Sequence, residues 1–117
     1  MVRMYLKATE NVHETKHHWE HLRSLVQEVC KNEKIDPKSV KAFFEEYEAW
    51  ATGPGAPEGF VNLRIATVPL GKEVESNLAD TLHAKLCEMY RHSLESGKAS
   101  VSVEIREMNP DNYRVSP

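Results

Sequence analysis

Three histidines spaced four residues apart are the first side chains in this sequence that could do chemistry. His13, His17 and His21 would lie along one stripe of a helix, and two neutral imidazoles one turn apart can bind a transition metal. The stripe continues through Ser24 and Glu28, opposite the apolar positions of the same helix. A solvated polar face explains this pattern better than a metal site does, so we expect no metal.

Other reactive side chains lack the sequence context that catalysis requires. Glu45, Glu46 and Glu48 form an acidic cluster, which is more typical of a charged edge or interface strand than of an acid–base pair. No serine stands in a G-x-S-x-G motif, and neither a G-x-G-x-x-G loop nor a Walker loop occurs. Cys30 and Cys87 lack C-x-x-C spacing and are expected to be reduced apolar residues. These residues give no support to nucleophilic hydrolysis, nucleotide binding or redox chemistry.

Alternating apolar and polar residues predict four strands, each with one face on a core. The strands are expected at 1–8, 40–50 and 60–68, and then around Val101, Val103 and Ile105. Helical spacing of apolar residues predicts one helix over 14–32, with Trp19 on its apolar arc. It predicts a second helix from Val74 to about Ser96, where Gly97 is placed as the C-terminal cap.

The order of these elements, β-α-β-β-α-β, predicts an α+β fold that is built twice. A single domain over 1–117 would consist of pseudo-repeat halves 1–51 and 60–107, joined by the glycine- and proline-rich loop 52–59. Both crossover helices would join parallel strands by right-handed connections and so cover the same face of a four-stranded mixed sheet.

The other face of that sheet would carry charged and aromatic side chains together. They are Arg3, Tyr5, Lys7, Lys41, Phe43, Glu45, Tyr47, Asn62, Arg64, Ser102, Glu104 and Arg106. A face of this composition favours contact with neighbouring subunits over contact with water alone.

Composition excludes several kinds of partner. With 15 Lys+Arg against 18 Asp+Glu, the formal net charge is −3, so no overall positive field would attract nucleic acid. No apolar run approaches the roughly 20 residues that cross a membrane, and the N-terminus has no signal-peptide pattern. We therefore expect a cytoplasmic protein without nucleic-acid or membrane partners.

Three segments of the second half resemble one known family. They are Phe60-Val-Asn-Leu-Arg-Ile, Gly71-Lys72-Glu-Val-Glu-Ser76 and Ser102-Val-Glu-Ile-Arg-Glu-Met-Asn-Pro110. They are similar to the 5-carboxymethyl-2-hydroxymuconate isomerase branch of the tautomerase superfamily. The resemblance extends over nearly the whole chain, although the first half matches by pattern more than by identity.

The resemblance implies a cofactor-independent homotrimer that catalyses a 1,3-keto-allylic proton shift on a small dicarboxylate, as in the degradation of aromatic compounds. The family's base is an N-terminal proline, but position 2 here is Val2, whose primary amine could serve only after removal of Met1. The family's two substrate-binding arginines correspond to Lys41 and Lys72, which keep the charge but lose the bidentate guanidinium.

Three more residues complete the site that the resemblance implies. Arg3 and Arg64 are expected to bind substrate as auxiliary cations, and Phe43 is expected to form an apolar wall. A small carboxylate is the expected ligand.

Two alternatives remain open at the level of sequence. One is a non-catalytic trimer of the same fold that binds a small anionic ligand or has a structural role. The other is a ferredoxin-like monomer or dimer, because that fold shares the β-α-β-β-α-β order and carries many unrelated functions.

Overall fold

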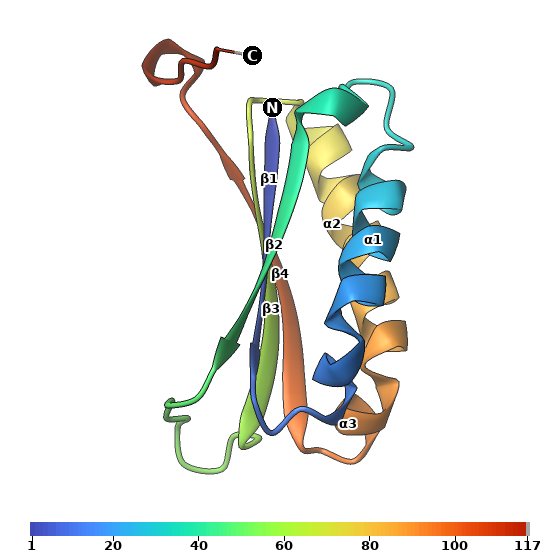
Figure 1. Cartoon of the computed structure of the whole chain (residues 1–117), viewed down its shortest axis with the longest axis vertical. Helices are drawn as coiled ribbons and strands as arrows, with labels where there is room; N and C mark the ends of the chain where they lie inside the picture. Colours follow the sequence, from blue (N-terminus) through green and yellow to red (C-terminus); the bar gives the residue numbers. More distant parts are fainter. Residues whose placement is uncertain (117) are drawn as a thin grey trace.

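Four strands form one mixed sheet (Figure 1). The computed structural model describes residues 1–116, and only the backbone of residues 15 and 16. The strands are β1 (Val2–Thr9), β2 (Val40–Tyr47), β3 (Gly59–Thr67) and β4 (Ala99–Glu107), arranged in the order β2-β1-β3-β4. β1 and β2 are parallel, β3 and β4 are parallel, and the central pair β1 and β3 is antiparallel. The predicted α+β class with a mixed four-stranded sheet is confirmed.

The helices of residues 1–116 that follow β1 and β3 pack on one side of this sheet (Figure 1). They are the 3-10 helix η1 (His13–His17), α1 (His18–Val29), α2 (Lys72–Met89) and α3 (Arg91–Glu95). Two further 3-10 turns, η2 (Pro37–Ser39) and η3 (Pro110–Asn112), precede β2 and follow β4. Each parallel strand pair is joined by a crossover that contains a helical segment. Because such connections are right-handed, both segments cover the same face, as the order of elements predicts.

The core lies between the sheet and α1 and α2. Its largest contributions come from the alternating inward residues of the two central strands, each no more than 1% exposed. They are Val2, Met4 and Leu6 of β1 and Val61, Leu63 and Ile65 of β3. The alternation of buried and half-buried residues, which runs through β3 and through β1 up to Ala8, matches the period of two in the sequence.

Two element boundaries differ from the prediction. β2 ends at Tyr47 and not at Trp50, because Tyr47 is opposite Thr9, the last residue of β1. The second helix is interrupted at Tyr90, whose backbone leaves helical geometry while its side chain is fully buried. Gly97 does cap this segment with a φ of 72°, and the backbone N–H of Lys98 donates to the Ser93 carbonyl oxygen.

The apolar face of the first helix packs on the core as predicted, with Leu25 and Val29 buried and Leu22 and Val26 partly buried, but Trp19 is an exception. Trp19 is 74% exposed, so its placement on the buried arc was wrong. The ring of His18 instead stacks on Phe44 of β2 at 4.6 Å between centroids, and His21 is half-buried. The prediction of a fully solvated histidine stripe was therefore wrong at His21. The helix also starts as the 3-10 helix η1, a common beginning for an α-helix.

Gly59 is required at the start of β3 by close packing. A Cβ at this position would lie 2.7 Å from Asn11 Oδ1, 2.9 Å from Thr9 Oγ1 and 3.2 Å from the Lys98 carbonyl oxygen. Gly59→Ala is therefore expected to destabilise the protein by about 1–3 kcal/mol, the usual cost of overpacking. Urea unfolding measures this, with Gly53→Ala as the control, because a Cβ at Gly53 meets nothing within 4 Å. Equal midpoints for the two variants would contradict the prediction.

Candidate functional site

One end of the sheet brings together the candidate residues nearest the N-terminus. Val2 is opposite Val40 of β2 on one side and opposite Thr67 of β3 on the other. Arg3 is directly opposite Lys41, so two cations stand side by side on the face that α1 and α2 leave uncovered. The start of α2 lies at the same end of the molecule (Figure 1).

Lys72 is the first residue of α2 and lies on the helix side of this end. It follows Gly71, whose φ of 99° allows the sharp turn from β3 into the helix. Its neighbours include two carboxyl groups that share a hydrogen bond, Glu75 and Glu107. That hydrogen bond raises the pKa of Glu107, whereas the positive charge of Lys72 acts to lower it. The pKa of Glu75 is lowered, mainly by the hydrogen bond from the Leu70 backbone N–H. Lys72 is thus exposed but faces negative charge within its own chain.

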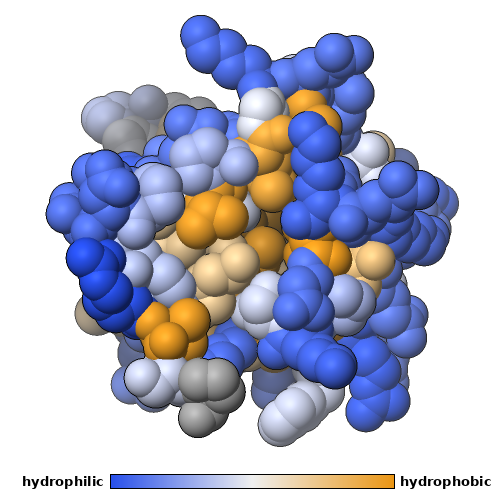
Figure 2. All heavy atoms as spheres, turned by 90° about the horizontal axis from the view of Figure 1, so that it is seen from above, coloured by the Kyte–Doolittle hydropathy of each residue, from blue (hydrophilic) through white to orange (hydrophobic). Residues whose placement is uncertain are grey.

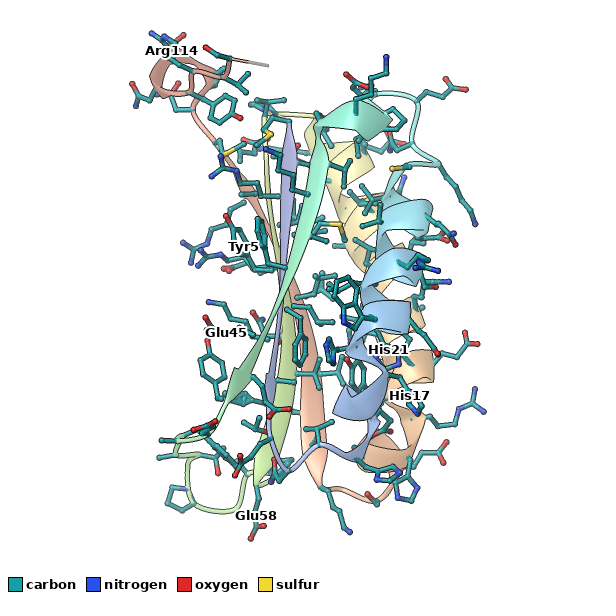
Figure 3. The ribbon with its side chains drawn as sticks, in the orientation of Figure 1. Tyr5, His17, His21, Glu45, Glu58 and Arg114 are labelled. Atoms are coloured by element: carbon teal, nitrogen blue, oxygen red, sulfur yellow. The ribbon has the colours of Figure 1, made fainter. Side chains whose placement is uncertain are left out.

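Phe43 and Arg64 lie further along the uncovered face and pack on one tyrosine. The ring of Phe43 stacks on Tyr5 at 5.6 Å between centroids, and the Arg64 guanidinium carbon lies 5.6 Å from the Tyr5 ring centroid. Tyr5 projects away from the helices, as does Glu45 (Figure 3). Since Tyr5 is two residues beyond Arg3, this aromatic group begins about 7 Å from the Arg3–Lys41 pair.

The end of the sheet that carries Arg3 and Lys41, here called the candidate end, is an open surface in the single chain. Seen from above, hydrophobic atoms gather near the middle of this end and hydrophilic side chains surround them (Figure 2). A hollow of about 350 Å³ lies toward the opposite end of the same sheet face, where Lys7, Trp50 and Phe60 are among its lining residues. The Trp50 Nε1–H donates to the Glu58 carbonyl oxygen across the 52–59 loop.

A buried polar group joins the start of the first helix to the end of the second. The Glu14 carboxylate accepts a hydrogen bond from the Ser93 backbone N–H at 3.0 Å and one from Ser93 Oγ at 2.5 Å. Burial alone would raise the pKa of Glu14, but the hydrogen bonds from Ser93 hold it below its usual value. Sequence reasoning missed this pair, because 79 residues separate its members and neither stands in a motif.

His21 takes part in the same junction through Tyr90. Its Nδ1 lies 2.9 Å from the Tyr90 hydroxyl, and in Figure 3 His21 lies on the sheet side of α1. Burial, and then the charge of His17, lower the pKa of His21, while burial raises the pKa of Tyr90. Within residues 1–116, where side chains are described, no group of three His, Cys, Asp or Glu could hold a metal ion.

Several solved structures are similar to this chain over nearly its whole length. A 5-carboxymethyl-2-hydroxymuconate isomerase from Deinococcus radiodurans R1 is 21% identical, with a TM-score of 0.87 over 98% of this chain and 88% of that chain. A 5-carboxymethyl-2-hydroxymuconate delta-isomerase is 10% identical, with a TM-score of 0.82 over 99% of this chain and 87% of that chain. A fused 4-OT symmetric trimer is 17% identical, with a TM-score of 0.68 over 97% of this chain and 91% of that chain.

Comparison at the level of sequence finds no relative of this chain. No protein-family model and no curated protein sequence matches the chain. No helix within residues 1–116 is long and apolar enough to cross a membrane. The structural matches cover nearly the whole chain and confirm, at the level of the fold, the resemblance that the second half of the sequence carries. The chain therefore has the fold of the 5-carboxymethyl-2-hydroxymuconate isomerases and of the other tautomerase-superfamily proteins.

Proposed function

We propose that this protein is a cofactor-independent isomerase that moves a proton within a small unsaturated keto or enol carboxylate. The observation that carries the proposal is the cross-strand pair of Arg3 and Lys41 beside the first residue of β1. Two adjacent cations attract a carboxylate, and they can also stabilise the negative charge that develops on an enolate oxygen. The fold shared with two proteins described as 5-carboxymethyl-2-hydroxymuconate isomerases supports the same reaction class.

In this proposal the base is the primary amine of Val2, exposed by removal of Met1. The Val2 side chain is 1% exposed and anchors the residue in the core, while its backbone lies at the end of the sheet between β2 and β3. An amine held there would reach a substrate whose carboxylate contacts Arg3 and Lys41. It takes the proton from the carbon next to the carbonyl group and returns it two atoms away, so no redox step or cofactor is required.

We further propose that the active form is a homotrimer in which neighbouring chains complete the site. The sheet face opposite the helices is uncovered in the single chain, and Phe43 on it is 50% exposed. The candidate end is open rather than enclosed, which agrees with a site that needs a second chain. The symmetric trimer among the similar structures supports this assembly. Its mass in solution, about three times 13.4 kDa, separates it from a ferredoxin-like monomer or dimer.

The test of the reaction is the rate at which the untagged protein converts phenylenolpyruvate to its keto form. The intact mass of the same sample shows whether its first residue is Met1 or Val2. Turnover by a Val2 form supports the isomerase, and its absence in that form would contradict it.

Lys72 is expected to bind the second carboxylate of a dicarboxylate substrate. Lys72→Ala should weaken dicarboxylate binding by up to about fivefold, because an exposed ion pair contributes up to about 1 kcal/mol. Isothermal titration with adipate measures this change. Lys85→Ala, on the same helix, serves as the control for the overall loss of one positive charge. Unchanged binding in Lys72→Ala would remove Lys72 from the site.

A second function is favoured by one residue, Val2 at the position of the family's proline. Without a secondary amine, the same fold and the same cations would suit a non-catalytic trimer that binds a small anion. Binding of adipate without any turnover is the outcome expected of that protein.

A further inference from the structure

Two histidines from opposite halves of the chain meet at the end of the molecule away from the candidate end. His13 is the first residue of η1 and His92 lies in α3, and in Figure 1 α3 is at the end opposite the N-terminus. Their ring centroids are 5.8 Å apart, with an angle of 62° between the ring planes. Both side chains are exposed, and within the described part of the chain neither ring forms a hydrogen bond or an ion pair. Their nitrogens are therefore available to a ligand.

The histidine stripe that the sequence placed along one helix is not the arrangement that forms. Since η1 is a 3-10 helix, with about three residues per turn, His17 lies roughly a third of a turn around from His13. His21 already has a partner, because its Nδ1 lies 2.9 Å from the Tyr90 hydroxyl. His13 is thus paired with His92 and not with the next histidine of its own segment.

The distance between these two rings suits one shared metal ion. Two imidazoles on a tetrahedral Zn²⁺ with Zn–N bonds of about 2.0–2.1 Å have ring centroids roughly 5 Å apart. The observed 5.8 Å is close to this value, and small rotations of two exposed side chains cover the difference. Imidazole is the commonest protein ligand of metals, and it suits Zn²⁺, Cu²⁺ and Ni²⁺.

The surroundings of the two rings favour a cation. His13 and His92 line a hollow of about 440 Å³, and Glu10 lines it with them. Although burial acts to raise the pKa of Glu14, the hydrogen bonds from Ser93 and the charge of the nearby His92 lower it, so a second carboxylate is ionised close to the rings. Of the described lining residues, Lys98 alone is a cation at neutral pH. The hollow also leaves room for the water molecules that would complete the coordination of an ion bound by two side chains.

The junction between Glu14 and Ser93 holds the two histidines together before any metal binds. Glu14 follows His13 in the chain, and Ser93 follows His92. The Glu14 carboxylate accepts hydrogen bonds from the Ser93 backbone N–H and hydroxyl, both of them buried. Because the backbone next to each ring is fixed in this way, metal binding would require little further ordering of the chain.

We infer that His13 and His92 form a binding site for a divalent transition-metal ion such as Zn²⁺, in which each imidazole supplies one nitrogen and water supplies the remaining ligands. The ion would tie η1 to α3 at the end of the molecule opposite the proposed substrate site. The inference therefore does not depend on isomerase activity, and the metal takes no part in the proposed proton transfer.

The test is Zn²⁺ binding by isothermal titration to the full chain, to His13→Asn and to His92→Asn. Both variants should bind Zn²⁺ at least about tenfold more weakly than the unmodified protein, since loss of a residue that merely supports a metal ligand already costs about 10–100-fold. His17→Asn is the matched control, because it removes an exposed histidine from the same 3-10 helix, and it should bind Zn²⁺ as the unmodified protein does. An equal loss in His17→Asn would place the ion on the stripe and overturn the inference.

Lys98→Gln tests the sign of the ligand's charge. Removal of this cation should leave Zn²⁺ binding unchanged or tighten it by up to about fivefold, the size of an exposed charge interaction. Inorganic phosphate is the alternative ligand, because protonated imidazoles and Lys98 would suit an anion. Phosphate binding that is lost in both His13→Asn and Lys98→Gln, in a protein that does not bind Zn²⁺, would overturn the inference and make the hollow an anion site.

Thermal unfolding gives an independent readout. The Tm of the unmodified protein should rise with Zn²⁺ concentration, because the ion binds the folded state, whereas the Tm of His13→Asn and His92→Asn should not. In the presence of EDTA the three proteins should have equal Tm values, since both side chains are exposed. Failure of the unmodified protein to bind Zn²⁺, or full Zn²⁺ affinity in either variant, would overturn the inference whether or not the protein is an isomerase.

Discussion

Val2→Ile is expected to lose at least ~100-fold of the phenylenolpyruvate turnover rate, because general base catalysis contributes about 10²–10⁴-fold. Isoleucine at position 2 is too large for efficient removal of Met1, so the amine would be displaced by one residue from the start of β1. The side chain itself changes little, since isoleucine adds one methylene to a residue that is already buried. The readouts are kcat/KM and the intact mass of each protein.

Two further variants make this result specific to the amine. Val61→Ile adds the same methylene at an equally buried position of β3 and should keep its activity, which controls for overpacking. Val2→Pro should remain at least as active as the unmodified protein, because proline permits removal of Met1 and leaves a secondary amine. Full activity in a Val2→Ile protein that retains Met1 would exclude the Val2 amine as the base.

Glu14→Ala is expected to lower the free energy of unfolding by roughly 2–5 kcal/mol. The change leaves two buried donors of Ser93, its backbone N–H and its hydroxyl, without their acceptor, and each such donor costs about 1–3 kcal/mol. It also breaks the junction that ties η1 to α3. Urea unfolding measures the effect, and Glu20→Ala, which removes an exposed carboxylate from the same region, should stay within about 0.5 kcal/mol of the unmodified protein.

The same carboxylate predicts a pH dependence of stability. Because the folded-state pKa of Glu14 is lowered by the bonds from Ser93, the folded protein favours the ionised form more than the unfolded chain does. The resulting stability is fully present above the unfolded pKa of about 4.3 and is lost as the pH falls through the lower folded value. Glu14→Ala should therefore show a shallower loss of stability below about pH 5. Parallel pH profiles for the two proteins would contradict this account.

Much of the fold follows from local sequence patterns. The period of two in β1 and β3 reflects burial of one strand face, so positions such as Met4 and Leu63 could be placed in the core from the sequence. Gly97 could be placed as a cap because helices commonly end at a glycine in the left-handed region, where Gly97 has a φ of 72°. Trp19 and Trp50 were misplaced, because the extent of the sheet that α1 covers and the length of β2 depend on what each element packs against.

The candidate site, too, was predicted only in part from the sequence. The sequence by itself determined the β-α-β-β-α-β order, the two-sided character of the sheet and the identity of its cations, because these depend on side-chain period and charge. Only the tertiary structure decided that Arg3 stands beside Lys41, that Tyr113 packs on Arg3 and that Glu14 reaches Ser93. Those contacts join residues that are far apart in the chain, and their geometry comes from strand register and helix packing rather than from any local preference.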